Sequence, residues 1–451
     1  MWAAGVAAVL IFGFGPARTA YHAPGLTSGF GFIGDVLVAP AARWDAAWYL
    51  TIAHQGYMPQ LGPFTEARAA FFPLYPLLIS LGLDIGLPGA VAGIAISVLA
   101  LLGALYGLHR LTALELHAPG SRLWRDPQRT GSLEQVPRLA LLLAALGPMA
   151  FFLSADYSES LFLALSIGAF LQARRGAFVS AGVLGGLAAA TRSTGVLLLV
   201  PVAIIYLYGP REGSVEDPRA EGGAEARATG LPGEGRAASR IPGPRVGVRA
   251  TIARLVRLLR PRFEIDASAA SLLLIPAGLG AYLAWYWLAG GEVLAPFHAQ
   301  ALWGRHFAGP FVAVFDGLKA AFEGARQLIS GQSRHLYYPL SGKSAFIEAE
   351  HNLMLLVFLL LALPALVGVF RRLPLAYGAY LLVALALPLS YPVVTQPLMS
   401  LPRFLLVMFP IFMWLAAYLA PRPRARSAVL VLCVLSLVFF TGEFSTWHWV
   451  A

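Results

Sequence analysis

The sequence predicts an all-α polytopic membrane protein, because the chain is apolar along most of its length, poor in charge and divided by short basic connections. Of its 451 residues, 58% are hydrophobic and only 12% are charged. The mean hydropathy is +0.68. Soluble globular domains carry roughly 25% charged residues, about twice this share. The composition therefore excludes a soluble globular protein.

The basic residues predict how the chain is oriented in the membrane. The formal net charge is +10, and arginine carries nearly all of it, since Lys319 and Lys343 are the only lysines. Cytoplasmic loops are enriched in Lys and Arg. We therefore expect the arginine-rich connections to be cytoplasmic, and this clustering gives little support for nucleic-acid binding. The connections are residues 110–138, 174–175, 211–262, 371–372 and 422–426.

Two neighbouring cytoplasmic connections must be joined by an even number of crossings. The apolar stretch 139–172 is therefore expected to break at SADYSES (154–160), and the stretch 176–208 at TRST (191–194). Each break gives a hairpin of helices shorter than the roughly 20 residues of an upright span. The result is about eleven transmembrane helices, with the N-terminus inside and the C-terminus outside. The remaining spans are residues 1–14, 89–112, 267–288, 351–370, 375–389, 404–419 and 427–440.

The segment 71–83 is apolar but does not fit this parity as a crossing. Counting it as a span would place the basic connection 110–138 outside the membrane. We therefore expect a re-entrant or interfacial segment here. Non-helical backbone at that depth is tolerated only where protein buries it.

The chain divides into two membrane modules and a linker. Residues 1–208 form the first module, with a first large outer loop at 16–88. Residues 209–266 are rich in Arg, Gly and Pro and are expected to be a cytoplasmic linker, disordered over 209–245. The linker then carries apolar residues at 252, 255, 256 and 259, which predict a basic amphipathic helix on the inner leaflet. Residues 267–451 form the second module, with a second large outer loop at 291–350.

Several polar groups are predicted to lie on the same outer side. Ionisable residues near membrane depth are costly, so their convergence indicates a functional site. The groups are Arg43 and Asp45, then 156–159, 191–193, the loop 291–350, and the turn 391–403 that ends in Arg403.

Asp45 is the candidate acid or base of this site. At helical spacing, Tyr49 and Ile52 share its face, whereas Trp44 and Trp48 lie on the neighbouring one. We expect an interfacial helix with tryptophan anchors and a carboxylate turned away from lipid. The alternative is that Asp45 has no catalytic role and is an acidic residue in the first turn of a helix, where the helix dipole favours it.

Arg192 and Arg403 are candidate phosphate ligands. A guanidinium forms paired, charge-assisted hydrogen bonds with a phosphate. Either arginine could instead be an ordinary interfacial anchor. The outer location of Arg403 opposes the positive-inside bias, which favours a functional role.

The remaining polar candidates each have two interpretations. Glu159 is expected to orient a sugar hydroxyl or to pair with an arginine, while Ser158 or Asp156 would cap the helix that follows. In the second outer loop, Gln300, Trp303 and Arg305 suit sugar stacking, although an interfacial aromatic belt is an equal alternative.

Metal and nucleotide motifs are missing from the sequence. It has no zinc spacing, P-loop or GxSxG elbow. The first outer loop offers only Asp35, Asp45 and Glu66, well separated, so we expect activity without a metal or other cofactor. Cys433 is the only cysteine, which excludes an intrachain disulfide.

Five blocks of sequence resemble the PIG-V family of membrane mannosyltransferases in order and spacing. The first and fourth are the specific ones. The blocks are RWDAAWYLTIAHQGY (43–57), AFFPLYPLL (70–78), YSESLF (157–162), GLAAATRSTGVL (186–197) and LPRFLLVMFP (401–410).

The resemblance implies a GT-C glycosyltransferase fold, with a catalytic aspartate in the first outer loop and a second large outer loop between the seventh and eighth spans. It implies an α-1,6-type mannosyltransferase that uses polyprenyl-phosphate mannose and inverts the anomeric carbon. Carried over by position, Asp45 would be the general base, and Arg192 and Arg403 would hold the donor phosphate. The substrate-binding residues would be Arg43, Trp44, Tyr57, Tyr157, Glu159, Gln300, Trp303 and Arg305.

The expected location is the plasma membrane, with the active site on the extracytoplasmic face and membrane lipids around the spans. The acceptor is a hydroxyl of a lipid-linked or cell-envelope glycan. Family members in eukaryotes act on a glycosylphosphatidylinositol anchor, whereas the arginine-rich, alanine-rich usage here resembles a bacterium. Two alternative functions are a lipid-linked sugar transporter or flippase, which needs polar residues on both faces, and a noncatalytic membrane scaffold.

Overall fold

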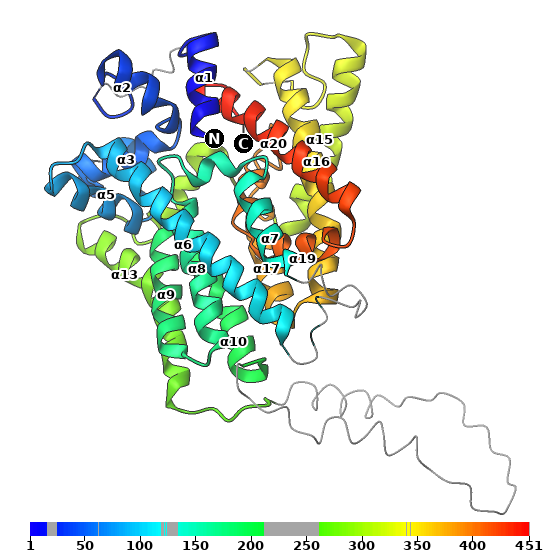
Figure 1. The fold of residues 1–451 in the computed structure, drawn as a ribbon. Coiled ribbons are helices and arrows are strands. Elements are labelled where there is room, and N and C mark those ends of the chain that lie inside the picture. The colour runs from blue at the N-terminus through cyan, green and yellow to red at the C-terminus, as the bar shows by residue number, and fades with distance from the viewer. Residues whose placement is uncertain are drawn as a thin grey trace, which may run out of the picture.

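The structure, a computed structural model, describes residues 1–15, 25–61, 63–118, 121, 123, 134–211, 261–339, 341–342 and 344–450. All regular elements in these ranges are helices (Figure 1), and one isolated bridge pairs Arg305 with Val393. The all-α prediction is confirmed. The predicted linker and its amphipathic helix fall mainly on residues 212–260, outside the described ranges.

The helices follow the chain in three groups, in which η denotes a 3₁₀ helix. The first are α1 (Trp2–Phe12), α2 (Gly31–Leu37), η1 (Ala39–Ala41), α3 (Ala46–Gln55), η2 (Pro59–Leu61), α4 (Pro63–Ala69) and α5 (Leu74–Asp84). Next come α6 (Gly89–His117), α7 (Gln135–Leu146), η4 (Ala150–Leu153), α8 (Glu159–Arg174), α9 (Phe178–Thr191), η5 (Ser193–Leu198) and α10 (Leu199–Tyr208). The last are η7 (Ala267–Leu273), α13 (Leu274–Leu288), α14 (Ala295–His298), η8 (Ala299–Trp303), α15 (Pro310–Ser330), α16 (Ala345–Arg372), α17 (Leu375–Leu389), α18 (Leu401–Leu406), α19 (Pro410–Leu419) and α20 (Pro423–Ser445).

Among the described residues, four stretches of helix are long and apolar enough to cross a membrane: α6, η7 with α13 (Ala267–Leu288), α16 and α20. The same part of the chain holds seven shorter apolar helices. Helices occupy the predicted spans, but the span predicted at 404–419 is divided between α18 and α19. The count of eleven crossings stays a prediction. Helix α5 rises about 16 Å, roughly half the hydrocarbon thickness, so its expected re-entrant position also stays a prediction.

Both predicted breaks in the apolar stretches are present. Helix α9 ends at Thr191, and η5 begins at Ser193. The other break lies between η4 and α8, where Ser158 is the N-cap of α8. The capping prediction was wrong, because no side chain caps this helix. The Ser158 hydroxyl is 2.8 Å from the hydroxyl of Tyr49 and bonds there instead.

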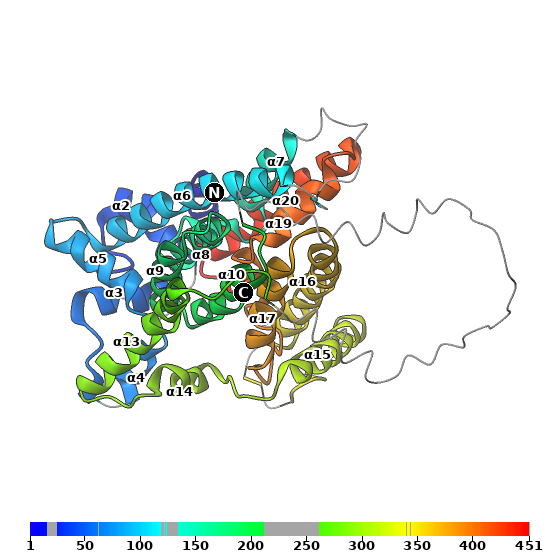
Figure 2. The ribbon, with the colours of Figure 1, turned by 90° about the horizontal axis from the view of Figure 1, so that it is seen from below.

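The central helices α6, α8 and α9 pack side by side, and α13 lies against α9 (Figures 1 and 2). Small residues allow the close approach of α9 and α13. A Cβ added to Gly278 would lie 1.9 Å from the carbonyl oxygen of Gly186. Close backbone packing through small residues is typical of helices in membranes.

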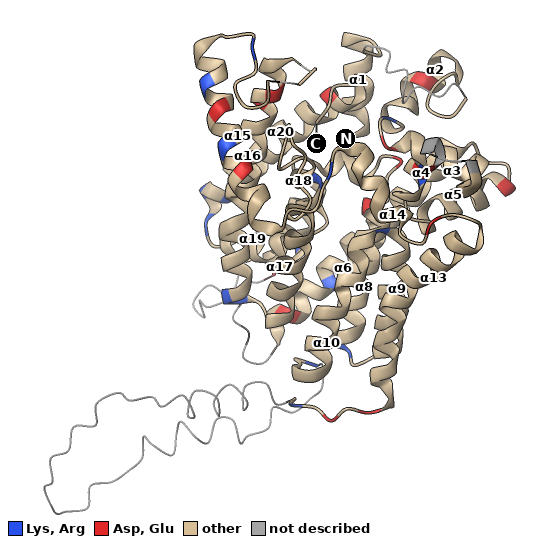
Figure 3. Cartoon of the chain, turned by 180° about the vertical axis from the view of Figure 1, so that it is seen from behind, with Lys and Arg blue, Asp and Glu red and all other residues tan. Residues whose placement is uncertain are grey.

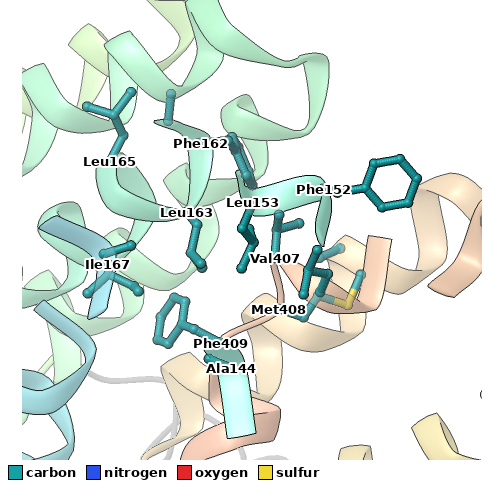
Figure 4. Close-up of a cluster of buried hydrophobic side chains, with 14 of the residues drawn as sticks. Ala144, Phe152, Leu153, Phe162, Leu163, Leu165, Ile167, Val407, Met408 and Phe409 are labelled. Atoms are coloured by element: carbon teal, nitrogen blue, oxygen red, sulfur yellow. The ribbon is translucent and has the colours of Figure 1, made fainter. Parts of the chain in front are cut away.

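A buried apolar cluster ties the start of α8 to the segment after α18 (Figure 4). Phe162 and Leu163 of α8 lie beside Val407, Met408 and Phe409. All five side chains are buried. This packing fixes the two segments that carry Glu159 and Arg403, which lie far apart in the sequence.

The chain ends return to the first outer loop. Helix α20 packs on α1 (Figure 1). The C-terminal segment after α20 covers the loop that carries Asp45, and the sequence analysis did not predict this contact. Charged side chains are sparse over the helices (Figure 3).

Candidate active site

Asp45 lies at the N-cap of α3, where a tyrosine from another segment fixes the backbone. The Asp45 N–H donates to the Tyr157 hydroxyl at 3.1 Å, and that hydroxyl donates to the Arg43 carbonyl at 3.0 Å. The preceding Trp44 has φ 55°, which is uncommon for a residue with a side chain. Tyr157 thus holds a tight turn that presents the Asp45 carboxylate.

Two arginines and two carboxylates form one network around this aspartate. Arg403 Nη1 is 2.5 Å from Asp45 Oδ2, and Arg403 Nε donates to Glu159 Oε1. Arg192 Nη1 is 2.5 Å from the same Glu159 oxygen. The four residues come from four segments of the chain. The structure therefore brings together residues that the sequence placed on a common outer side.

Glu159 and Asp45 differ in their access to solvent. The Glu159 side chain is 0% exposed, whereas that of Asp45 is 17% exposed and lines a pocket. Glu159 lies behind the two arginines and orients them. Asp45 faces the cavity, where a hydroxyl can approach it.

The pocket has a volume of about 250 Å³ and a surplus of positive charge. Three arginines and one carboxylate line it, with aromatic and hydroxyl side chains between them. This set suits a substrate that carries both an anionic group and a sugar. The lining residues are Asp45, Tyr49, Ala70, Phe71, Phe72, Thr191, Arg192, Ser193, Thr194, Pro296, Phe297, Gln300, Trp303, Arg305, Leu387, Pro388, Tyr391, Ser400, Arg403 and Phe404.

Arg305 enters the pocket from the segment 291–350, the predicted second outer loop. Its guanidinium donates to the carbonyls of Tyr391 and Met399, each at 3.2 Å, and to the Ser400 hydroxyl at 3.3 Å. Within the part of the chain that the structure describes, it forms no ion pair with a carboxylate. Burial, and to a smaller extent the charge of Arg403, lowers the pKa of Arg305 to about 10. The group stays charged at neutral pH, and an anion in the pocket would stabilise it.

Trp303 and Gln300 also line the pocket, which is a requirement for the sugar contacts expected of them. Trp303 packs edge-on against Phe71 and Trp48, with centroid distances of 5.8 and 6.2 Å. Trp48, expected to be an anchor in the membrane interface, instead stacks on Phe71 at 5.7 Å. The aromatic side chains thus form one wall of the site.

Four other candidate residues do not line the pocket. Tyr157 lies beneath Asp45, as described above. The Tyr57 hydroxyl donates to the Phe71 carbonyl at 2.6 Å. Arg43 donates to the Ser445 carbonyl at 3.2 Å, and Trp44 packs against the C-terminal tryptophans. These residues support the first outer loop from behind.

Several pocket residues were missed by the sequence analysis. Phe71 and Phe72 lie in the block AFFPLYPLL (70–78), but no pattern in that block distinguishes residues that line a pocket from residues of the apolar core. Thr191 and Ser193 belong to the group 191–193, and Tyr391 and Ser400 to the turn 391–403; the sequence analysis predicted that both groups face the outer side but did not name these four residues as substrate contacts. The lining residues that were not named as candidate contacts are Tyr49, Phe71, Phe72, Thr191, Ser193, Thr194, Tyr391, Ser400 and Phe404.

Asp156 is a second buried acid close to the site. It is 0% exposed, and neither carboxyl oxygen has a hydrogen-bond partner among the described residues. Burial raises the pKa of Asp156 well above its ordinary value. Asp156 therefore favours its neutral form.

A metal site is not evident in the described ranges. Those residues hold no group of three or more His, Cys, Asp or Glu side chains that could bind an ion. Metal independence stays a prediction.

Comparison with known proteins gives this geometry a context. Residues 32–207 match the family model described as Mannosyltransferase (PIG-V). The match confirms the resemblance for the four blocks between residues 43 and 197, and it includes Asp45, Glu159 and Arg192, whereas the block at 401–410 lies outside it. The PIG-V match ends before Arg305 and Arg403, which complete the pocket.

Curated relatives agree with the PIG-V match. GPI alpha-1,6-mannosyltransferase 2 of Rattus norvegicus is 34% identical over 168 residues, which cover 36% of this chain and 31% of the relative. GPI mannosyltransferase 2 of Chaetomium globosum is 34% identical over 201 residues, 39% of this chain and 40% of the relative. The human GPI alpha-1,6-mannosyltransferase 2 is 31% identical over 180 residues, 37% and 32% respectively. The chain thus matches between 31% and 40% of these relatives' length. No solved structure matches the chain.

Proposed function

We propose that this protein is an integral-membrane mannosyltransferase. It transfers mannose from polyprenyl-phosphate mannose to a hydroxyl of a lipid-linked or cell-envelope glycan, with inversion at the anomeric carbon. The reaction takes place on the outer face of the plasma membrane. The observation that carries the proposal is the pocket in which Asp45 faces three arginines, in a chain whose residues 32–207 match PIG-V mannosyltransferases.

Asp45 acts as the general base. The acceptor oxygen forms a bond to the anomeric carbon while the bond from that carbon to the phosphate oxygen breaks. The acceptor proton moves to the Asp45 carboxylate, and the lipid phosphate leaves as an anion that needs no added proton. Positioned proton transfer of this kind contributes about 10²–10⁴-fold to the rate.

The arginines stabilise the leaving phosphate. Arg192 and Arg403 are oriented by Glu159, so little reorganisation is needed when negative charge develops. Arg403 also contacts Asp45. A phosphate in the pocket competes with Asp45 for this guanidinium, which frees the carboxylate to accept a proton. Donor binding thereby prepares the base.

The sugar is held by the wall that Trp303 and Gln300 contribute to the pocket. Arg43, Trp44, Tyr57 and Tyr157 act through the backbone that they support. Divalent cations have no role in this scheme. Transfer is expected to continue after chelation with EDTA.

The test is mannose transfer from radiolabelled polyprenyl-phosphate mannose to endogenous acceptors in membranes, at matched expression. Asp45→Asn is expected to lower transfer by about 10²–10⁴-fold. Asp156→Asn is the matched control, because it changes a nearby buried acid that already favours its neutral form, and it should leave transfer unchanged. Equal activity in Asp45→Asn and the wild type would exclude Asp45 as the base. No transfer by the wild type would refute the proposed donor.

A further inference from the structure

The end of helix α20 lies directly behind the turn that carries Asp45. Arg43 Nε donates to the Ser445 carbonyl at 3.2 Å, and the Arg43 guanidinium lies 4.7 Å from the centre of the Trp447 ring. Arg43 and Trp447 are both buried. A guanidinium is attracted to the face of a tryptophan ring, and removal of water strengthens the attraction. The chain just before Asp45 is therefore tied to the chain at the end of α20.

Arg43 depends on the Trp447 ring more than a surface arginine would. Arg43 Nη2 is buried and has no hydrogen-bond partner among the residues with described positions. A buried polar group without a partner costs free energy. The ring of Trp447 offsets part of that cost through its electrons. Loss of the ring would leave Arg43 weakly held, and Arg43 is only two residues from Asp45.

Two tryptophans with an uncommon backbone conformation meet at this place. Trp44 has φ 55° and Trp447 has φ 64°, in the left-handed region that residues with a side chain seldom adopt. Their rings pack edge-on with centroids 5.6 Å apart, and Trp449 packs on Trp44 at 5.2 Å. Such a conformation persists only where the surrounding structure holds it. These contacts therefore help to keep the turn at Trp44, and with it the direction of the Asp45 carboxylate.

The end of α20 also supports the tyrosine that bonds to the Asp45 backbone. Phe444 packs on Phe152 and on Tyr157, with centroid distances of 5.4 and 5.9 Å. Tyr157 accepts the Asp45 N–H. Phe444 and Trp447 thus lie behind the same turn and contact different residues of its support.

We propose that Trp447 is a positioning residue for the general base, because its ring holds the turn that presents the Asp45 carboxylate to the acceptor. This inference rests on the proposed function, in which Asp45 takes the acceptor proton. Trp447 lies outside residues 32–207, the range that matches PIG-V mannosyltransferases. The phosphate-binding arginines are oriented by Glu159. Trp447 should therefore act on proton transfer and leave donor binding unchanged.

The experiment compares Trp447→Leu, which removes the ring but keeps an apolar side chain, with Trp447→Phe, which keeps a ring. The matched control is Phe178→Leu. The Phe178 ring is also buried and also lies 4.7 Å from a guanidinium, that of Arg211, but it is at the opposite end of α9 from the pocket residue Thr191.

The kinetic readout separates a positioning role from a structural one. In Trp447→Leu, the kcat for mannose transfer per folded molecule should fall about 10- to 100-fold, because a small displacement of a catalytic group is costly. The KM for polyprenyl-phosphate mannose should not change. Trp447→Phe should recover most of the lost kcat, and Phe178→Leu should have the kcat of the wild type. The inference would be overturned by an unchanged kcat in Trp447→Leu, an equal loss in the control, or a rise in KM alone.

A second measurement does not depend on the donor. Hydrogen exchange followed by mass spectrometry should show faster exchange of the backbone amides of residues 43–50 in Trp447→Leu, and no change there in Phe178→Leu. Unchanged exchange in Trp447→Leu would also overturn the inference. If the wild type transfers no mannose from polyprenyl-phosphate mannose, the proposed function fails, and the exchange alone decides whether Trp447 holds the turn.

Discussion

Two clusters of carboxylate and arginine are buried in the part of the protein that the structure describes, and they differ in what surrounds them. At the pocket, Glu159 pairs with Arg192 and Arg403, whose side chains are 14% and 10% exposed. In the second cluster, Glu115 of α6 pairs with Arg174 at the end of α8, and both side chains are 2% exposed. The Tyr377 hydroxyl donates to the same Glu115 oxygen at 2.6 Å.

The second cluster is sealed and matched in charge. Arg174 also donates through Nη1 to the Pro210 carbonyl at 2.6 Å, so both its Nε and its Nη1 bond within the protein. The first cluster opens to a cavity with Asp45 and Arg305 and has more cations than anions around that cavity. Burial of an ion pair is therefore not by itself a sign of function. Access and surplus charge are what distinguish the candidate active site.

Among the replacements in the two clusters, that of Glu159 is expected to have the largest combined effect on stability and on mannose transfer. In Glu159→Gln, Arg192 and Arg403 both lose their buried partner, and the free energy of unfolding should fall by about 3–5 kcal/mol. Transfer per folded molecule should also fall by at least about tenfold, since the arginines are no longer oriented. Unfolding titrations in mixed micelles and mannose transfer measure the two effects. Normal transfer per folded molecule would show that Glu159 has only a structural role.

Glu115→Gln should lower stability as much as Glu159→Gln does, but it should leave mannose transfer unchanged. Arg174 is left buried and unpaired, so the free energy of unfolding should again fall by about 3–5 kcal/mol. Mannose transfer, corrected for the amount of folded protein in the same titration, should equal that of the wild type. A loss of corrected transfer would mean that the sealed cluster is coupled to the pocket, and the contrast drawn above would be wrong.

Tyr377→Phe should give a smaller loss in the sealed cluster. It removes one hydrogen bond to a charged group and leaves the ion pair intact. The expected loss is about 1.5–3 kcal/mol of unfolding free energy, measured in the same titration. Tyr380→Phe is a suitable control, since its hydroxyl makes a long contact of 3.5 Å with an uncharged acceptor, the Val407 carbonyl. Equal stability of Tyr377→Phe and the wild type would argue against the hydrogen bond to Glu115.

Arg192→Lys should sharpen the comparison with the smallest change. Lysine keeps the charge but loses the planar fork that binds phosphate through two bonds. We expect the KM for the donor to rise about tenfold, because one charge-assisted hydrogen bond to the phosphate is lost. Arg174→Lys, the same change in the sealed cluster, should leave this KM unchanged and lower stability instead. Steady-state kinetics with varied donor distinguish the two, and equal KM values would contradict a phosphate role for Arg192.

Much of the fold could be predicted because its signals are local or additive. The apolar character of a segment and the positions of its arginines can be read directly from the sequence. These two signals predicted the helices and the breaks at 154–160 and 191–194. The breaks also predicted that Arg192 lies at a turn. The contacts of Trp48 were harder, because a tryptophan near an interface can pack on lipid or on protein with the same sequence pattern.

The sequence by itself determined that the chain is helical and apolar, and it determined which residues carry charge near a helix end. Only the tertiary structure decided which of those charges meet. Arg403 reaches Asp45 across 358 residues and Glu159 across 244, through packing that no local pattern records. The same packing places Tyr57 behind the site and Tyr391 in its wall. The physical reason is that helix periodicity is a property of neighbouring residues, whereas a pocket is formed by side chains from segments that pack only after the helices associate.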